Sequence, residues 1–473
     1  MRIIIVSNRV AHEEKPQAGG LASAILNILR TRDGLWIGWD GRISESQESF
    51  TASNSSIDFR LFPLSDKEYS EYYLSFSNEI IWPVCHLRPS YLRATENTYR
   101  TYCSVNQKFA EVTLQSLHEE DVVWVHDYHL MLVGWNLRDR GFEGRMGYFH
   151  HIPIPPPELL KTIPHHETLL SGLLSYDLVG VQTLNDLKNL CTYYQELASH
   201  NVRLELEHTT EHSFQITHFG HVTQFAAYPI SIDTAGIEQL APQSVLLPEI
   251  EALRESLQQR PLAIGVDRLD YSKGLENKYH AWDKYLSRYA HTHDSTCTPV
   301  LLQIANKSRN DIENYSNLRV GLEALASQIN ADHGSPSYAP IRYLNTVYSH
   351  TVLTGLYRLA QVGLVTPTKD GMNLVAKEYV AAQDPEDPGV LVLSEFAGAA
   401  EELTQALLVN PFHTHSLAET IHKALHMPRA ERVQRHQALM RTLRSNTIHT
   451  WYQRFLEDLG VAENSHVYGD VAS

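Results

Sequence analysis

The sequence predicts an α/β protein built from two doubly wound, Rossmann-like domains that face each other across a cleft. Short apolar runs alternate with helix-length amphipathic segments along the chain, and the pattern restarts with a new strand in the second half. The chain has 473 residues, whereas a single hydrophobic core rarely grows beyond about 300 residues. At least two domains are therefore expected.

The expected strands are apolar throughout, which is the pattern of parallel strands buried on both faces. They lie at Ile3–Val6, Val122–Val125, Met146–Phe149, Leu178–Val181, Leu262–Val266, Pro299–Ile304, Val362–Val365 and Val390–Leu393. Helices are expected at Leu21–Arg30, Asn185–Ala198, Leu275–Ala290, Ile312–Ile329 and Val375–Ala382. Because ligands bind at the carboxyl ends of strands in open α/β sheets, the loops that follow these strands are where a site is expected.

The boundary between the two domains is expected in the stretch from Tyr228 to Asp233, just before the strand pattern restarts. We therefore expect an N-terminal domain over residues 1–232 and a C-terminal domain over residues 233–449. Residues 450–473 are expected to hold a helix that crosses back to the N-terminal domain.

Composition excludes several classes of protein. The net charge is −16, the opposite of the basic footprint that general nucleic-acid binding requires. The four cysteines are dispersed and form no CxxC pair, which argues against a zinc ribbon, a redox motif or a secreted disulfide scaffold. The first apolar run is too short for a signal peptide, and no stretch reaches the roughly 18–20 apolar residues that span a bilayer. A cytoplasmic protein with no membrane partner is expected.

Several catalytic motifs are absent from the sequence. It has neither a P-loop nor a GxGxxG following a strand, which disfavours ATPases and nicotinamide dehydrogenases. It also lacks GxSxG, HExxH and the Asp-x-Asp motif of metal-dependent nucleotide-sugar transferases. The remaining candidates are the polar loops that follow the strands.

Two cations follow the strand Leu262–Val266 in the second half. Arg268 and Lys273 leave the strand together, and a glycine then precedes a helix. Two cations beside a helix N-terminus suit a diphosphate held without a metal, because Arg supplies a fork for phosphate oxygens and Lys a point charge. The alternative interpretation is a surface ion pair of these cations with Asp267 and Asp270.

A second candidate loop follows the strand Val362–Val365. Gly371 permits a tight turn whose backbone N–H groups can face an anion or a sugar. Asp370 can accept hydrogen bonds from sugar hydroxyls, and Glu378 on the next helix can hold the vicinal hydroxyls of a ribose. An N-capping Asp and a solvated helical Glu are the alternative.

The N-terminal half offers a complementary set of polar groups. Arg9 lies at the end of the first strand, and Gly19 and Gly20 open a loop into the first helix that suits phosphate. Arg9 as a plain surface charge is the alternative. Asp127 follows another strand, and His151 belongs to a histidine pair before a proline-stiffened turn, of which one member is expected in the core.

Taken together, these loops resemble the trehalose-6-phosphate synthases, a retaining nucleotide-sugar glycosyltransferase family with the GT-B fold. Agreement of many separate loops, in order and at matching spacing, is far more specific than any single motif. The similarity runs from Ser7 to Pro411 and is nearly continuous at Trp124–Leu130, Arg268–Leu275 and Asp370–Asp384.

The resemblance implies that the C-terminal domain binds the nucleotide-sugar donor and the N-terminal domain the acceptor. The implied catalytic residues are Arg268, Lys273, Asp127 and His151. The implied donor-binding residues are Arg268, Lys273, Gly19, Gly20, Asp370, Met372, Asn373, Leu374 and Glu378. The implied acceptor-binding residues are Arg9, Trp39, Tyr73, Trp82, Asp127 and Arg309. No metal and no cofactor are implied.

The implied reaction transfers glucose from UDP-glucose to glucose 6-phosphate and yields α,α-trehalose 6-phosphate and UDP, a step of trehalose biosynthesis. Front-face attack is expected, with Asp127 as a covalent nucleophile the lesser alternative. A glucosylglycerol-phosphate synthase and a non-catalytic regulatory homologue remain alternatives, although the second would be expected to lack some of Arg268, Lys273, Asp370 and Glu378. The nucleotide base is left open, and a homo-oligomer is expected.

Overall fold

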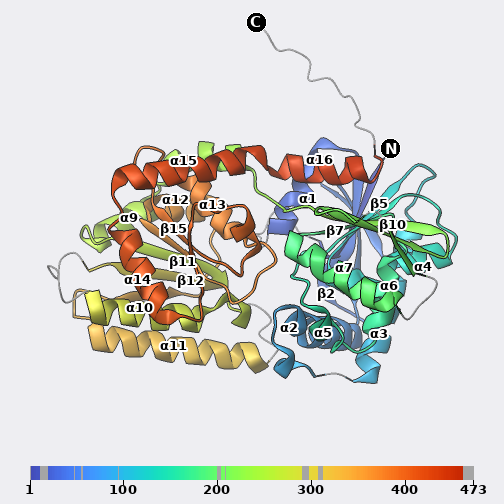
Figure 1. Cartoon of the computed structure of the whole chain (residues 1–473), viewed down its shortest axis with the longest axis horizontal. Helices are drawn as coiled ribbons and strands as arrows, with labels where there is room; N and C mark the ends of the chain where they lie inside the picture. Colours follow the sequence, from blue (N-terminus) through green and yellow to red (C-terminus); the bar gives the residue numbers. More distant parts are fainter. Residues whose placement is uncertain are drawn as a thin grey trace, which may run out of the picture.

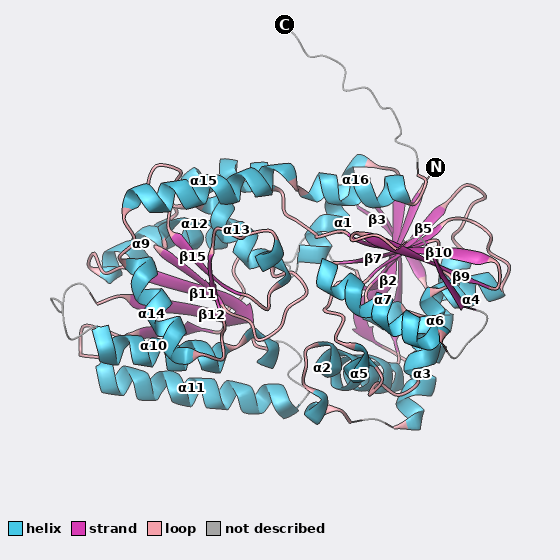
Figure 2. Ribbon diagram, in the orientation of Figure 1, coloured by secondary structure: helices cyan, strands magenta, loops and turns pink. Residues whose placement is uncertain are grey.

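The strands of the molecule form two sheets, each with helices packed against it (Figures 1 and 2). This arrangement confirms the predicted α/β class. The computed structural model describes residues 2–10, 20–46, 48–54, 57–93, 95–199, 204–207, 209–289, 298–306 and 313–461.

The first sheet consists of β1 (Ile3–Arg9), β2 (Gly34–Ile43), β3 (Phe50–Asn54), β4 (Ile57–Leu64), β5 (Val122–His126), β6 (Met146–Phe149), β7 (Leu178–Val181), β8 (Leu204–Glu207), β9 (Ser213–His218) and β10 (His221–Ala227). The strand order is β3-β4-β2-β1-β5-β6-β7-β10-β9-β8. The pairs from β4 to β10 are parallel, whereas β3, β9 and β8 pair antiparallel at the two edges. The sequence did not predict these edges, because their strands are half buried or largely exposed and lack a continuous apolar run.

The second sheet is parallel throughout. Its strands are β11 (Leu262–Arg268), β12 (Val300–Asn306), β13 (Ile341–Leu344), β14 (Val362–Val365), β15 (Val390–Ser394) and β16 (Leu407–Val409). They are ordered β13-β12-β11-β14-β15-β16. The direction of winding reverses between β11 and β14, and open α/β sheets bind ligands at such a switch point.

Helices pack on both sheets, and within the described ranges none is long and apolar enough to cross a bilayer. The first sheet carries α1 (Gly20–Thr31), the π-helix η1 (Glu68–Ile81), α2 (Trp82–Cys85), η2 (Pro89–Tyr91), α3 (Glu96–Leu114), η3 (Tyr128–Leu130), α4 (Val133–Asp139), α5 (Pro157–Leu160), α6 (His166–Leu173) and α7 (Leu184–Ala198). After the linker come α8 (Thr234–Ser244), α9 (Pro248–Leu257), η4 (Tyr271–Lys273), α10 (Leu275–Tyr289), α11 (Glu313–His333), α12 (His350–Leu359), α13 (Leu374–Ala382), η7 (Gly398–Glu401), α14 (Thr414–Leu425), α15 (Arg429–Ser445) and α16 (Ile448–Asp458).

The last two helices run in succession over both sheets, with α15 above the second sheet and α16 above the first (Figure 1). The Phe455 ring of α16 stacks on the indole of Trp124, with centroids 4.4 Å apart. It lies over Gly147 and Gly180, where an added Cβ would come within 2.7 and 2.9 Å of the ring. Glycine in β6 and β7 therefore makes the recess that seats α16.

The chain passes between the two sheets through a linker whose backbone is held from both sides. Ile230 donates its N–H to Oε1 of Gln182 at 3.0 Å and accepts from Nζ of Lys377 at 2.8 Å. Lys377 is fully buried and pairs with Glu402 at 2.5 Å. Asn446 donates to both Glu402 and the Pro229 carbonyl. The predicted domain boundaries at 232/233 and 449/450 stay predictions.

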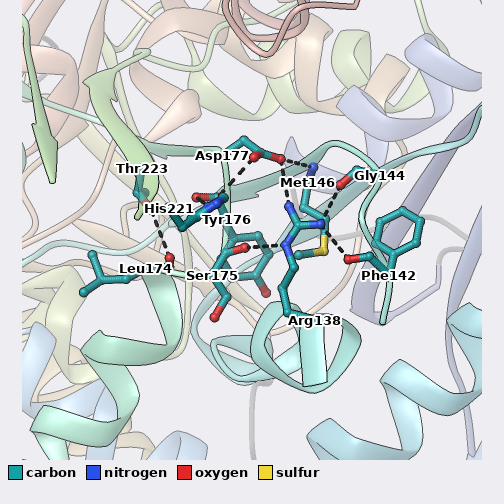
Figure 3. A network of polar contacts seen from close by, with 10 residues as sticks. All are labelled: Arg138, Phe142, Gly144, Met146, Leu174, Ser175, Tyr176, Asp177, His221 and Thr223. Atoms are coloured by element: carbon teal, nitrogen blue, oxygen red, sulfur yellow. Dashed lines mark hydrogen bonds and ion pairs between the residues drawn. The ribbon is translucent and has the colours of Figure 1, made fainter. Parts of the chain in front are cut away.

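A polar network closes the amino-terminal ends of β6, β7 and β10, opposite the edge where ligands bind (Figure 3). Arg138 donates to the carbonyls of Phe142 and Gly144 and pairs with Asp177 at 3.1 Å. Asp177 also accepts the N–H of Met146 at 2.7 Å. These contacts satisfy backbone groups at the start of the strands, which gives the network a structural role.

Replacement of Phe455 by Ala should lower the free energy of unfolding by about 3–5 kcal/mol, because it leaves a cavity between α16 and the first sheet. Urea unfolding followed by circular dichroism measures the change. The matched control is Phe412→Ala, since Phe412 is 52% exposed and its loss should change stability by less than about 0.5 kcal/mol. Equal effects of the two substitutions would contradict the packing role of Phe455.

Candidate active site

The loops after β11, β14 and β15 are joined by backbone hydrogen bonds into one surface at the carboxyl edge of the second sheet. The N–H of Thr368 donates to the carbonyl of Ser272 at 2.8 Å, and the N–H of Asp370 donates to that of Phe396 at 3.1 Å. The N–H of Ala399 donates to the Met372 carbonyl at 2.8 Å. Backbone groups of this surface are therefore fixed before any ligand binds.

Lys273 is placed by a glycine turn. Gly274 has φ +64°, and an added Cβ there would lie 2.4 Å from the carbonyl oxygen of Thr366. Both the positive φ and the close approach require glycine. The turn leads directly into α10, so Lys273 stands just before the N-terminus of that helix.

Lys273 and Asp370, two predicted donor-binding residues, form an ion pair with each other. Their side chains are 11% and 13% exposed. Asn373, which has φ 72°, donates from Nδ2 to Asp370 Oδ2 at 3.0 Å. Burial, the largest single effect, raises the pKa of Asp370, but the charge and the hydrogen bond of Lys273, together with Arg268 and other neighbouring groups, outweigh it, so the pKa lies below its ordinary value. The carboxylate is therefore ionised and preorganised as an acceptor.

Glu378 lies on α13, one turn beyond the Asp370 loop. The hydroxyl of Tyr357 lies 3.5 Å from its Oε2. Burial raises the pKa of Glu378, and His350 partly counteracts that effect. Met372 and Leu374, the other predicted donor contacts, flank Asn373 at the start of the same helix.

Arg268 reaches from the second sheet to the first. Its guanidinium carbon lies 5.2 Å from the ring centroid of Trp82, which is within the range of a cation–π contact. Trp82 in turn stacks on His86, with centroids 4.0 Å apart. Burial lowers the pKa of His86 to about 4, so this ring is neutral beside the cation. The structure thus brings a predicted donor residue and a predicted acceptor residue together.

Three predicted acceptor residues cluster together, one from the end of β1, one from within β2 and one from within η1. The Arg9 guanidinium lies 5.4 Å from the Trp39 ring, and the Trp39 and Tyr73 rings are 5.5 Å apart. Gly41 leaves room for Arg9, because an added Cβ there would lie 2.9 Å from its terminal nitrogen. Arg9 itself is exposed, so its charge is available to an anion.

A continuous row of rings, which we call the aromatic row, joins this cluster to Arg268. Tyr73 stacks on His129 at 5.9 Å, His129 contacts Tyr128 at 3.9 Å, and Tyr128 lies 5.9 Å from Trp82. His86 extends the row beyond Trp82. Most of these rings are almost completely buried, with Trp82 4%, Tyr128 1% and His129 8% exposed. The row therefore acts as a rigid support that separates the two cationic ends of the site.

Asp127 follows β5 with the unusual φ of 77°. Its N–H donates to the Phe149 carbonyl at 2.8 Å, and its Oδ1 accepts the backbone N–H of His151 at 3.2 Å. These contacts support a backbone conformation that is costly for a non-glycine residue, a type of strain that clusters at functional sites.

His151 has both ring nitrogens within hydrogen-bonding distance of the protein. Its Nε2 lies 3.1 Å from Nδ1 of His126, and its Nδ1 lies 3.4 Å from Nε2 of Gln182. Burial, together with His126 and His150, lowers the pKa of His151 well below its ordinary value. The ring is therefore neutral.

The loops of the two sheets touch at glycines. An added Cβ on Gly371 would lie 2.3 Å from the carbonyl oxygen of His151, and one on Gly398 would lie 1.9 Å from the carbonyl oxygen of Gly371. Gly398 also faces the Thr183 side chain, at 2.9 Å from the added Cβ. The donor loops can approach the first sheet this closely only because these positions lack side chains.

Gly19 and Arg309 lie outside the described residues, and Gly20 begins α1. Sequence reasoning missed His86 and Gln182, which contact Trp82 and His151 respectively. His86 carried no motif, and Gln182 only followed an apolar run. Gln182 could have been predicted only from its position at the carboxyl end of β7, where ligands bind in open α/β sheets.

Comparisons with known proteins agree with this geometry. The model of Glycosyltransferase family 20 matches residues 3–460. A trehalose-6-phosphate synthase from Enterobacter sp. (strain 638) is 41% identical over 461 residues, which cover 97% of this chain and 95% of that protein. A trehalose-6-phosphate synthase from Klebsiella pneumoniae is 40% identical, with 100% and 98% of the two chains covered.

Solved structures are similar over the same length. A UDP-forming α,α-trehalose-phosphate synthase from Burkholderia xenovorans, in complex with glucose 6-phosphate, has a TM-score of 0.92 and 39% identity, covering 97% of this chain and 100% of that one. An E. coli structure bound with UDP-2-fluoro glucose has a TM-score of 0.90 and 39% identity, covering 98% and 100%. These similarities confirm the predicted GT-B fold. Because the family model spans nearly the whole sequence and the relatives match from end to end, the chain belongs to glycosyltransferase family 20.

Proposed function

We propose that this protein transfers glucose, with retention, from UDP-glucose to glucose 6-phosphate and forms α,α-trehalose 6-phosphate and UDP. The observation that carries the proposal is the contact of Arg268 with Trp82 across the two sheets. This contact places Arg268, a cation expected to bind the diphosphate, at one end of the aromatic row. The exposed Arg9 lies at the other end. Relatives that match over 95% or more of their length bear the same activity in their names.

Arg268 and Lys273 would stabilise the departing diphosphate. Negative charge grows on the phosphate oxygens as the glycosidic bond breaks, and preorganised cations at that point lower the barrier. When the donor binds, Lys273 would turn from Asp370 to the phosphate. Asp370 would then accept from hydroxyls of the glucose, and Glu378 would hold the ribose.

The acceptor phosphate would bind Arg9, with Tyr73 and Arg309 as further ligands. Charge-assisted hydrogen bonds to phosphate are the strong kind, and Arg presents a fork that matches the anion. Trp39, Trp82 and Asp127 would contact the sugar ring, and Gly19 and Gly20 would close over the donor.

Retention would proceed by front-face attack of the acceptor hydroxyl, with a phosphate oxygen of the leaving group taking its proton. Asp127 accepts the backbone N–H of His151, which suits a positioning task better than that of a covalent nucleophile. A glycerol phosphate acceptor would leave Tyr73, Trp82 and Asp127 without the sugar ring that they are expected to contact. Assembly into a homo-oligomer and a cytoplasmic location stay predictions from the sequence.

Replacement of Arg268 by Ala should lower kcat about 10²–10³-fold with the fold intact, because one stabilising charge is lost from the transition state. Arg268→Lys should retain part of the rate, since the charge stays while the fork is lost. Steady-state kinetics of UDP release measure both, and Arg288→Ala, at an exposed surface pair, is the matched control.

Wild-type rates should persist in EDTA. Loss of activity in EDTA that a divalent ion restores would contradict a metal-free diphosphate site.

Free glucose should react at least on the order of 10³-fold less efficiently than glucose 6-phosphate, because charge-assisted hydrogen bonds to the phosphate contribute about 1.5–3 kcal/mol each. Arg9→Ala should raise the KM for glucose 6-phosphate and leave the weak reaction with glucose unchanged. Arg254→Ala removes an exposed arginine of α9 and is the control. Similar kcat/KM for both acceptors in the wild type would show that the assignment of Arg9 is wrong.

Replacement of Gly371 by Ala should lower kcat/KM for the donor on the order of 100-fold. The added Cβ lies 2.3 Å from the His151 carbonyl, so the two loops must separate by about 1 Å to reach ordinary contact, and misplacement by that distance has such an effect on catalysis. The control is Gly321→Ala in α11, where the nearest atom is 3.6 Å away. It should leave activity unchanged. A fully active Gly371→Ala enzyme would contradict contact between these loops during catalysis.

A further inference from the structure

We propose that Gln182 is a positioning residue that fixes the proton of His151 on Nε2, so that Nδ1 is the nitrogen available to the donor sugar. Gln182 follows β7 and is 1% exposed. It lies between the linker backbone and the ring of His151. The part of the proposal that concerns the sugar rests on the proposed function, whereas the position of the proton does not.

The orientation of the Gln182 amide follows from its other contact. The N–H of Ile230 can only donate, so the amide atom that it meets at 3.0 Å is the oxygen. The amide nitrogen therefore faces Nδ1 of His151 at 3.4 Å. Because an amide nitrogen can only donate, Nδ1 of His151 must accept.

A neutral imidazole carries one proton, and the position of that proton on His151 is then determined. With Nδ1 accepting, the proton lies on Nε2 and is donated to Nδ1 of His126 at 3.1 Å. Burial lowers the pKa of His126 to about 3, so this second ring is also neutral. Its own proton must lie on Nε2, a buried atom that meets no hydrogen-bonding group among the described residues.

The linker residue Ile230 holds Gln182, and with it the tautomers of His151 and His126, in place. The carbonyl of Ile230 accepts from the buried Lys377, so the residue that orients Gln182 is itself tied to α13. The backbone of His151 is fixed on both sides, since its N–H donates to Asp127 and its carbonyl lies against Gly371. The ring of His151 is therefore held beside the predicted donor loop in one defined protonation pattern.

The consequence for the donor concerns the direction of a hydrogen bond. Nε2 of His151 already donates to His126 at 3.1 Å, whereas the contact of Nδ1 with Gln182 is long at 3.4 Å. A sugar hydroxyl can replace that weaker contact only by donating its proton to Nδ1. The site therefore selects for a group that carries a proton, and it discriminates against an ether or a fluorine at the same place.

Nitrogen NMR of the full chain labelled with ¹⁵N-histidine tests the proposal directly, with His151→Gln and His126→Gln used to assign the two rings. Both rings are expected as the Nε2–H tautomer in the ligand-free wild type. A proton on Nδ1 of His151 would overturn the proposal without any further variant.

Gln182→Glu is the informative substitution. At pH 9 an ionised carboxylate offers only acceptors, so Nδ1 of His151 must carry the proton and both histidines should switch tautomer together. The matched control is Gln383→Glu, because Gln383 is also buried at 5% exposure and its amide bridges backbone groups of Gly389 and Tyr357 far from His151. An unchanged His151 tautomer in Gln182→Glu at pH 9 would overturn the proposal.

Kinetics separate this inference from the proposed function. Gln182→Glu should raise the KM for UDP-glucose about tenfold, the usual worth of one hydrogen bond, and leave the KM for glucose 6-phosphate unchanged. A wild-type protein that lacks transferase activity but shows the predicted tautomers would contradict the proposed function alone. The expected tautomers with an equal rise in both KM values would overturn the claim that Nδ1 serves the donor.

Discussion

The relative position of the two sheets depends on the contacts of the buried Lys377 ammonium with Glu402 and with the carbonyl of Ile230. A charge removed from water must be paired and hydrogen-bonded to be tolerated, and Lys377 meets this requirement with Glu402 and the carbonyl of Ile230. If the linker moved relative to α13, the charged ammonium of Lys377 would be exposed to solvent or left buried without its hydrogen-bond partner. Because α13 begins at the predicted donor loop and Gln182 contacts the linker from the other sheet, a single linker residue, Ile230, connects the loops of both sheets.

At the predicted donor loops, the two sheets approach each other through backbone and through rings. Gly371 and Gly398 lie against backbone or a threonine methyl with no space for a Cβ, so close approach is possible only where side chains are absent. Trp82, which meets Arg268, offers a flat and rigid surface at low conformational cost. An overall charge of −16 is compatible with an anionic substrate because Arg268 lies where the two sheets meet and Arg9 is exposed.

The sequence predicted β1, β5, β6, β7, β11, β12, β14 and β15, most of which are continuous apolar runs. It missed β2, β4 and β10 in the parallel part of the first sheet, β13 and β16 in the second sheet, and β3, β8 and β9 at the antiparallel edges. Most of the missed strands interrupt their apolar residues with polar ones. Arg268, Lys273 and Asp370 were singled out by their position after strands, whereas several other donor contacts came only from the family resemblance. The structure shows Lys273 and Asp370 in contact. That pairing joins residues 97 positions apart, and no local pattern encodes it. His86 and Gln182 were missed for a related reason, because their importance lies in what they contact.

The ion pair of Lys273 with Asp370 has a consequence for how binding energy is distributed between substrate and transition state. Both side chains are nearly buried, so the ammonium has already lost most of its hydration shell when the chain folds. If the donor diphosphate binds Lys273 as proposed, it would displace a carboxylate rather than water, and the two anions would compete for the same cation. The ground-state complex would then gain little from Lys273, whereas the charge that develops on the leaving group in the transition state would be stabilised. Such an arrangement would weaken donor binding and raise kcat.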